Sequence, residues 1–397
     1  MQQQAGAAQH PMTKLFLEFF KTEKASGVIL IACTVCSLAL ANTGWGSSYA
    51  SIWQYAIFDH PVTYWINDGL MTLFFLLVGL EIEREVYVGE LSQPRKALLP
   101  IVAALGGMGV PALLHFSLNA GTATQAGMSI PMATDIAFAL GVLSLLGKRV
   151  PFALKVFLTA FAIIDDLGAI LVIGLFYTKG ISITNLLAAL FIILVLAACN
   201  RLKVRNLLFY LVSGIALWYF IHESGIHSTI TGVILAFLVP FDKGDDSSLS
   251  YKLQHGLHYI VAFGVLPLFA LANTNLKIDT GWYATLLHPN SLGIIMGLVL
   301  GKFLGISAFS FLAVKMNLCS LPASFRWKHL FAVSILGGIG FTMSMFMTLL
   351  AFQDASLIDQ SKISILVASL VAGLIGYVSL RLSLGSDPPQ LTGDDQW

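Results

Sequence analysis

Charged residues are scarce in this 397-residue chain, and their scarcity argues against most soluble folds. Asp, Glu, Lys and Arg make up 11% of the residues, whereas soluble domains contain about 25%. Hydrophobic residues make up 57%. The net charge is only +1, so nothing in the composition favours a nucleic-acid partner. This balance is typical of an integral membrane protein.

Cysteine is also scarce, and the four cysteines lie in or beside apolar segments. Cys33 and Cys36 have the spacing of a redox motif, but they lie inside a predicted membrane span without a clustered histidine. That setting favours a packing role. The chain has no metal or nucleophile constellation, so we expect no cofactor, and an enzyme is the least favoured class of function.

The chain has instead a series of long apolar runs. We predict an all-α integral membrane protein with twelve transmembrane helices, at roughly 20 residues per span. The predicted spans are 25–43, 62–86, 97–118, 123–147, 152–177, 183–200, 206–220, 225–240, 253–275, 291–314, 329–351 and 362–384. Residues 1–385 form one polytopic domain in this interpretation, and the polar residues 386–397 form a disordered tail.

The distribution of Lys and Arg supports this topology, because cytoplasmic loops are enriched in both. With the N-terminus in the cytoplasm, eighteen of the 22 Lys and Arg residues fall on the cytoplasmic side. Lys179, Lys277 and Lys362 fall outside, and Lys302 lies within a span. We therefore expect both termini to be cytoplasmic.

Two predicted spans are interrupted near their middle. The fourth contains Pro131, which removes a helical hydrogen bond, and the eleventh contains a glycine cluster, which weakens a helix. The polar and glycine residues at these breaks are Thr134, Asp135, Gly337, Gly338, Gly340 and Thr342. The alternative interpretation is a mild kink at Pro131 and close packing at the glycines.

The breaks occupy matching places in two three-helix units, about 97–177 (helices 3–5) and 291–384 (helices 10–12). These units would have inverted topology, and matching interruptions in two halves point to a transporter's binding site. If the discontinuous helices 4 and 11 cross, Asp135 and Lys302 would offset the partial charges of the half-helix ends.

Asp165 and Asp166 are the strongest functional candidates, because no other charge occurs between Val156 and Thr178. Charge at membrane depth is costly and therefore suggests function. Burial and mutual repulsion favour proton uptake by at least one carboxylate, and carboxylate oxygens also suit a hard cation.

Adjacent residues lie about 100° apart on a helix. One aspartate could therefore line an ion path while the other meets Lys302, the single charge of helix 10. Lys302 lies on a helix that carries a glycine stripe, which would allow close packing: Gly293, Gly297, Gly301 and Gly305. The alternative is a static buried charge network, although such a network gains little stability over apolar packing.

Other polar groups within or beside the spans are weaker signals. Several Glu and His at one cytoplasmic mouth could form a titrating cluster, because His titrates near neutrality. A single His there is otherwise an interfacial hydrogen-bonding residue. The candidates for this cluster are Glu81, Arg84, Glu85, His227, His255 and His258, and Asp68 is a separate intramembrane polar residue.

Five motifs, in order along the chain, resemble the NhaA family of sodium/proton antiporters. They are Asn67–Leu70 (NDGL), Phe75–Glu81 (FLLVGLE), Ala133–Gly141 (ATDIAFALG), Ile163–Ile170 (IIDDLGAI) and Gly338–Ser344 (GIGFTMS). The resemblance extends from about Ser26 to Arg381.

This resemblance implies a multi-pass antiporter of the bacterial inner membrane that exports Na⁺ or Li⁺ in exchange for protons. It implies that Asp166 binds the ion and the proton, with Asp165 beside it. Thr134 and Asp135 would belong to the helix 4 break, and Lys302 would pair with Asp165 or stabilise the crossing. It also implies a homodimer, often formed through a hairpin between helices 1 and 2.

The supposed pH-sensing region departs from the family pattern. Gln254 stands where relatives have an acidic residue, and Glu83 where they have a basic one. Glu81, Arg84, Glu85, His227 and His258 match. Two rival functions remain from the sequence: a symporter for organic anions, for which Lys302 is the sole midplane cation, and a membrane sensor, which would lack a soluble signalling domain.

Overall fold

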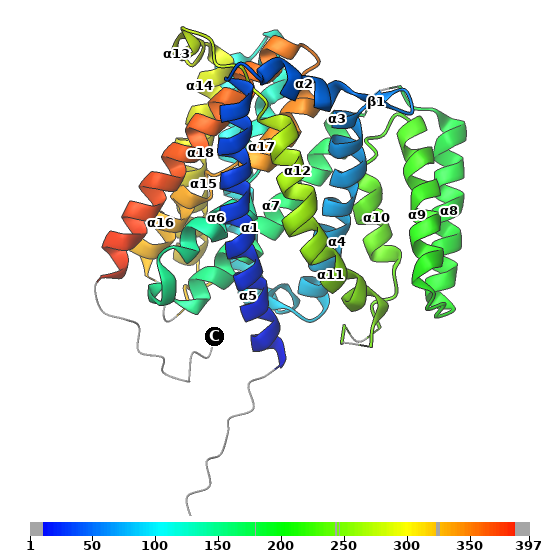
Figure 1. Cartoon of the computed structure of the whole chain (residues 1–397). Helices are drawn as coiled ribbons and strands as arrows, with labels where there is room; N and C mark the ends of the chain where they lie inside the picture. The colour runs from blue at the N-terminus through cyan, green and yellow to red at the C-terminus, as the bar shows by residue number, and fades with distance from the viewer. Residues whose placement is uncertain (1–10, 179, 243, 246, 323–325, 386–397) are drawn as a thin grey trace, which may run out of the picture.

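The computed structural model describes residues 11–178, 180–242, 244–245, 247–322 and 326–385, and the predicted tail 386–397 lies outside them. The described residues form a bundle of helices with one small hairpin (Figure 1). We call the end at which α1 (Pro11–Ala41) begins the lower end of the bundle, and the opposite end the upper end, as drawn in Figure 1.

The elements follow one another in a simple order. After α1 come α2 (Gly46–Gln54), β1 (Ala56–Ile57), β2 (His60–Pro61), α3 (Val62–Tyr64), the π-helical η1 (Trp65–Leu70), α4 (Met71–Tyr87), η2 (Glu90–Ser92) and α5 (Pro94–Asn119). Next are η3 (Ala123–Met132), α6 (Ile136–Ser144), η4 (Gly147–Arg149), α7 (Phe152–Phe176), α8 (Ile183–Arg201), α9 (Leu207–Glu223) and α10 (Ile230–Leu238). The remainder comprises α11 (Leu249–Ile260), η5 (Val261–Val265), α12 (Leu266–Asn273), α13 (Trp282–Thr285), α14 (Pro289–Met296), η6 (Gly297–Gly301), α15 (Lys302–Lys315), α16 (Trp327–Leu336), α17 (Phe341–Ala351) and α18 (Ala355–Leu384).

The described residues contain eight helical segments long and apolar enough to cross a membrane, or ten with two bent pairs counted as spans. The chain is therefore all-helical in its membrane part, as predicted. Two helices at predicted spans fall below this length: α9, at the seventh span, has 17 residues, and α10, at the eighth, has only nine. Nine residues span only about 14 Å, so the number twelve stays a prediction.

The two predicted breaks are present. The axes of η3 and α6 differ by 43°, and those of α16 and α17 by 48°. Pro131 lies in the last turn of the 3₁₀-helix η3, and the chain is non-helical at residues 133–135. The second break follows α16, where Gly337 forms the C-cap, and Gly340 is the N-cap of α17.

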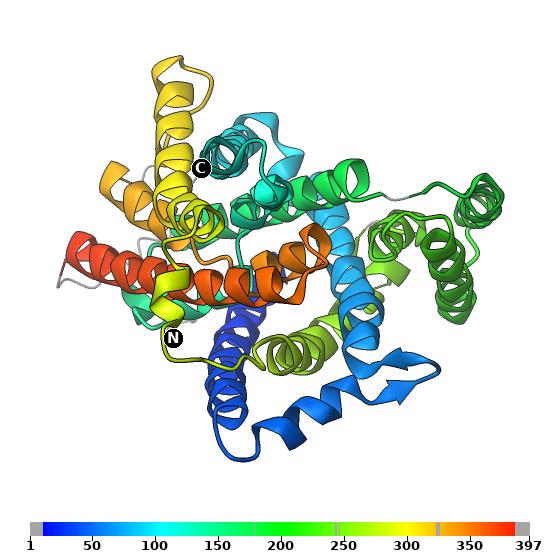
Figure 2. The same ribbon diagram turned by 90° about the horizontal axis from the view of Figure 1, so that it is seen from above.

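The glycine stripe packs where the sequence predicted close contact. α15 lies against α5, and viewed from above α8 and α9 form a separate pair at the edge of the bundle (Figure 2). A side chain at Gly297 or Gly301 would approach Pro131 or Pro111, respectively. A Cβ at Gly305 would overlap the carbonyl oxygen of Gly106, so the two backbones touch directly.

Replacing Gly305 with alanine should therefore lower the melting temperature of the purified protein. Overpacking costs about 1–3 kcal/mol, and a backbone carbonyl has little room to yield. Gly109→Ala, on the same helix as Gly106, is the matched control because no atom lies within 4 Å of its added Cβ. Alanine there should be neutral or stabilising. Equal melting temperatures for the two variants would contradict this account of the stripe.

A short hairpin lies at the upper end between α1 and α4. β1 and β2 are antiparallel, with Ala56 opposite Pro61 and Ile57 opposite His60. Phe58 and Asp59 form the turn with φ of 49° and 63°, as two-residue turns of type I′ require. The Phe58 side chain is 85% exposed. The hairpin that the resemblance implied is therefore present in the chain.

Candidate functional site

Asp165 and Asp166 lie in the middle of α7 and are buried, with exposures of 0% and 2%. The helix around them is apolar, so both carboxylates depend on other helices for partners. Oδ1 of each aspartate is buried without a hydrogen-bond partner among the described residues. Unpaired buried oxygens are costly, and such costs are characteristic of functional rather than structural groups.

Lys302 satisfies the other oxygen of Asp165. Its Nζ lies 2.6 Å from Asp165 Oδ2 and also donates to the carbonyl of Met132, at the end of η3. The ring of Phe161 lies 5.4 Å from the same Nζ. Lys302 is fully buried and begins α15 directly after the π-helical turn η6. The two aspartates are thus divided as their spacing predicted: Asp165 meets Lys302, and Asp166 does not.

The two broken helices are joined at Asp135. Its Oδ1 accepts a hydrogen bond from Phe138 N at 2.9 Å, and its Oδ2 accepts from Thr342 N at 3.0 Å and Thr342 Oγ1 at 2.5 Å. The backbone N–H of Asp135 donates to Ile339 O at 2.7 Å. Asp135 therefore lies at the N-terminal ends of both α6 and α17, where a negative charge is stabilising.

Thr134 and the glycines complete the contact between the breaks. Thr134 Oγ1 donates to Gly337 O at 2.8 Å. A Cβ on Gly338 would overlap the carbonyl of Leu298, and one on Gly340 would overlap the Ser344 hydroxyl. Freed backbone groups in a membrane must find partners within the protein, and here the two breaks supply partners for each other.

Asp166 lines a small cavity of about 30 Å³, which is large enough to hold water. Glu81 and His258 are the other titratable residues of its wall, and the rest of the lining is apolar. His258 Nδ1 lies 4.0 Å from Glu81 Oε1. Asp166 is thus connected to the predicted cluster at the lower end of α4.

The other members of that cluster lie on the same two helices as Glu81 and His258, α4 and α11. The Arg84 guanidinium is 6.0 Å from the Tyr251 ring, and Glu85 Oε2 accepts a hydrogen bond from Glu90 N at 3.0 Å. The exposed His255 lies between the rings of Tyr251 and Tyr259, at 6.2 and 5.8 Å. The structure thus brings together five predicted residues: Glu81, Arg84, Glu85, His255 and His258.

Comparison with known proteins finds related sequences over nearly the whole chain. Residues 17–380 match the family described as Na⁺/H⁺ antiporter 1. A protein of Flavobacterium johnsoniae, named Na(+)/H(+) antiporter NhaA 1, is 56% identical over 373 residues, which cover 94% of this chain and 98% of the relative. Na(+)/H(+) antiporter NhaA of Dechloromonas aromatica is 54% identical, covering 96% and 98%. One from Clostridium beijerinckii is 44% identical, covering 92% and 95%.

The chain belongs to the Na⁺/H⁺ antiporter 1 family. Its relatives are named as antiporters, which are secondary transporters and not enzymes. Together with the apolar helices, this membership makes the chain a multi-pass bacterial membrane protein.

The structure corrects one grouping. We placed His227 at the cytoplasmic mouth, but it lies at the opposite end of α4, where its Nε2 is 3.5 Å from Asp68 Oδ1. Ser228 Oγ donates to the same carboxylate oxygen at 2.9 Å. The predicted topology already implied this position. The second span, which contains Asp68, and the eighth span, which contains His227, both start on the side opposite the cytoplasm.

Three polar contacts in the described structure were not predicted from the sequence. The buried Lys362 donates to Asn273 Oδ1 at 3.3 Å, and Asn273 Nδ2 donates to Asn67 Oδ1 at 2.8 Å. We counted Lys362 as a loop charge because it stands at the edge of its apolar run. His115, also buried, lies 3.2 Å from Asn290. Lys362 and His115 are polar residues in or at the edge of apolar runs, and this position could have indicated that they are buried and hydrogen-bonded.

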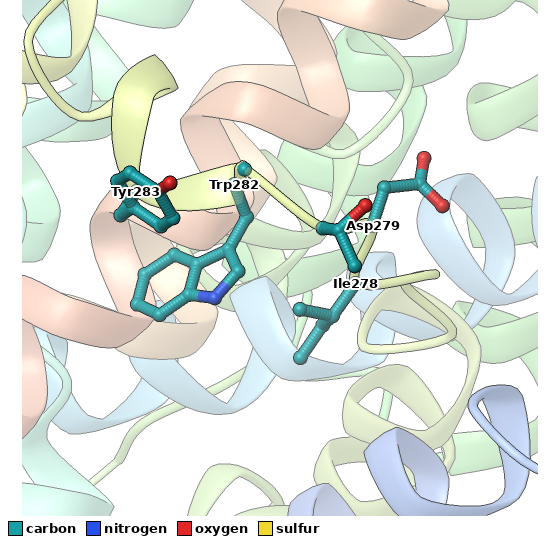
Figure 3. A pocket seen from close by; sticks show the side chains of 6 residues that line it. Ile278, Asp279, Trp282 and Tyr283 are labelled. Atoms are coloured by element: carbon teal, nitrogen blue, oxygen red, sulfur yellow. The ribbon is translucent and has the colours of Figure 1, made fainter.

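The open hollow shown in Figure 3 lies apart from these groups. It is formed by residues ahead of and within α13 and has a volume of about 510 Å³. Its lining residues are Ile278, Asp279, Thr280, Gly281, Trp282 and Tyr283. The Asp279 carboxylate points away from the Trp282 indole (Figure 3). The hollow therefore shares no residue with the buried carboxylates.

Proposed function

We propose that this chain exports Na⁺ or Li⁺ from the bacterial cytoplasm in exchange for entering protons. The observation that carries this proposal is the Asp166 carboxylate, which is buried in α7 and faces a cavity toward the lower end, with one oxygen that accepts no hydrogen bond from any described residue. A carboxylate in that setting can hold either a proton or a small cation. The names of the relatives support the same exchange.

The surrounding residues have distinct roles in this proposal. Asp166 binds the ion and the proton, and Asp165 stands beside it in its pair with Lys302. Asp135 and Thr134 hold the breaks together with Thr342, while Gly338 and Gly340 allow the backbones to meet. We take the two bent pairs as crossing helices 4 and 11 of two inverted repeats in a twelve-helix transporter.

The proposed cycle is a competition for the same carboxylates. Na⁺ displaces protons on the cytoplasmic side, the site reorients, and protons displace Na⁺ outside. If two protons enter for each Na⁺, the cycle moves one positive charge inward. The membrane potential then drives sodium export with about 2.3 kcal/mol per charge for each 100 mV. Lys302 is the alternative carrier of the second proton.

Everted vesicles from cells that lack their own antiporters test the proposal. Na⁺ or Li⁺, but not K⁺, should discharge an imposed pH gradient, and an imposed potential should change the rate. Discharge that ignores the potential would refute the two-proton stoichiometry. If neither Na⁺ nor Li⁺ discharges the pH gradient at any pH around neutrality, although the protein is correctly inserted, the proposed exchange is refuted.

We further propose that the cluster of Glu81, Arg84, Glu85, His255 and His258 regulates transport by pH. Two of its members, Glu81 and His258, line the Asp166 cavity, and it contains two histidines, the side chain whose unperturbed pKa is closest to neutrality. Two departures from the family fall here: the half-buried Gln254 on α11, and Glu83, which is buried and whose Oε2 has no hydrogen-bond partner within the described part of the chain.

Gln254→Glu should therefore displace the pH profile of exchange. An added carboxylate favours the protonated form of neighbouring histidines, so activation that follows their deprotonation would move toward alkaline pH by about one unit. The profile is measured in everted vesicles, with Gln254→Met as the uncharged control. A profile identical to that of the wild type would remove residue 254 from regulation.

The proposal also sets the orientation and assembly. The lower end faces the cytoplasm, with both termini there, in the inner membrane. The hairpin β1–β2 with its exposed Phe58 lies at the upper end and contributes to a homodimer contact.

A further inference from the structure

A second pocket lies at the lower end, between the start of α5, the first turns of α7 and the segment that follows α15. Its volume is about 360 Å³. It shares no lining residue with the cavity of Asp166. The proposed transport route therefore leaves this pocket without a role.

The lining of this pocket is divided by chemistry. Arg95 and Lys96, in the first turn of α5, and Glu90 provide charged groups, so the lining carries more positive than negative charge. Leu99, Val156 and Phe157 provide buried apolar surface. Lys96 Nζ lies 3.7 Å from Glu90 Oε2, and Arg95 is exposed. The pocket thus combines cations at its rim with an apolar wall.

The length of α5 places that rim at the level of lipid headgroups. The helix has 26 residues and is about 39 Å long, longer than the hydrocarbon core of about 30 Å. Its first turn therefore extends into the headgroup layer. Guanidinium and ammonium groups bind phosphate there, and the apolar wall suits the beginning of an acyl chain.

We propose that this pocket binds the headgroup of an anionic phospholipid, with its phosphate at Arg95 and Lys96 and its upper acyl chain against Val156 and Phe157. A free phosphate would use the cations but not the apolar wall. Glu90 opposes the negative charge of the ligand, so it limits the affinity. Basic residues near a membrane surface attract anionic lipids.

The test is native mass spectrometry of the full chain, purified in a neutral detergent and titrated with phosphatidylglycerol. Arg95→Gln with Lys96→Gln should weaken binding roughly tenfold. Glu90→Gln should strengthen it about threefold, and this opposite sign separates a binding effect from damage to the fold. Arg201→Gln with Lys203→Gln, two exposed cations at the same end outside the pocket, should leave binding unchanged. Leu321→Trp, on the lining, should weaken binding by filling the pocket.

Two further titrations distinguish the source of the phosphate. Phosphatidylcholine should bind at least about tenfold more weakly than phosphatidylglycerol, because its headgroup has no net charge. Inorganic phosphate should not compete with the lipid. Equal binding of both lipids, competition by inorganic phosphate, or equal loss in the Arg201 and Lys203 control would each overturn the assignment. These readouts do not depend on transport, so they stand apart from the proposed exchange.

Discussion

Asp166→Asn is expected to reduce Na⁺-driven proton movement to background while leaving the protein folded. Asparagine has nearly the same shape but neither holds a proton at this position nor offers a charged oxygen to a cation. Because Asp166 Oδ1 has no hydrogen-bond partner in the described structure, the substitution breaks no contact there. It also removes the cost of a buried charge.

Fluorescence quenching in everted vesicles measures the transport, and the melting temperature of the purified protein measures the fold. Asp279→Asn, an exposed carboxylate at the upper end, is the control and should transport normally. Normal exchange by Asp166→Asn would show that the ion binds elsewhere. Loss of exchange together with a much lower melting temperature would mean that Asp166 supports the fold.

Lys302→Met should have the largest effect on stability. The substitution leaves Asp165 buried without the ammonium that now lies 2.6 Å away, and it removes the donor to the Met132 carbonyl. Breaking a buried ion pair on one side costs about 3–5 kcal/mol. Lys315→Met, at the exposed end of the same helix, should cost almost nothing.

The double variant Asp165→Asn with Lys302→Met decides the cause. Replacing both charges removes the unpaired carboxylate, so the melting temperature should recover most of the loss. Thermal unfolding of the wild type, both single variants and the double variant gives the coupling directly. Strictly additive losses would mean that the two side chains do not stabilise each other.

The features with the largest energetic cost in a membrane were the ones that the sequence predicted. A charge or a break at membrane depth has few tolerable arrangements. Asp165, Lys302 and the breaks at Pro131 and Gly337 were therefore identifiable, and in the structure Lys302 lies 2.6 Å from Asp165 and both helix pairs are bent. The glycine stripe also predicted a close helix contact correctly, because glycines spaced by four residues are needed mainly where another backbone packs against the helix.

Features that depend on packing between distant segments were not predictable. The π-helical turns η1, η5 and η6 have no sequence pattern of their own. The burial of Lys362 depends on Asn273, 89 positions away. The ends of some helices were predicted wrongly. The span predicted at 225–240 is helical only from Ile230 to Leu238 in α10, because apolar residues continue beyond the ends of the helix. Roles in binding and regulation remain predictions, since they concern ions and not the fold.

The shared carboxylate of Asp135 also constrains how the chain is assembled during synthesis. Its partner Thr342 lies 207 residues later in the sequence. At about 5–20 residues per second, the ribosome needs roughly 10–40 s to make the intervening chain. During that interval the N-terminal end of α6 is in place, but the end of α17 that shares its carboxylate does not yet exist. The first half of the chain must therefore enter the bilayer before Asp135 has its hydrogen bonds to Thr342, and these bonds form only when the second half is inserted.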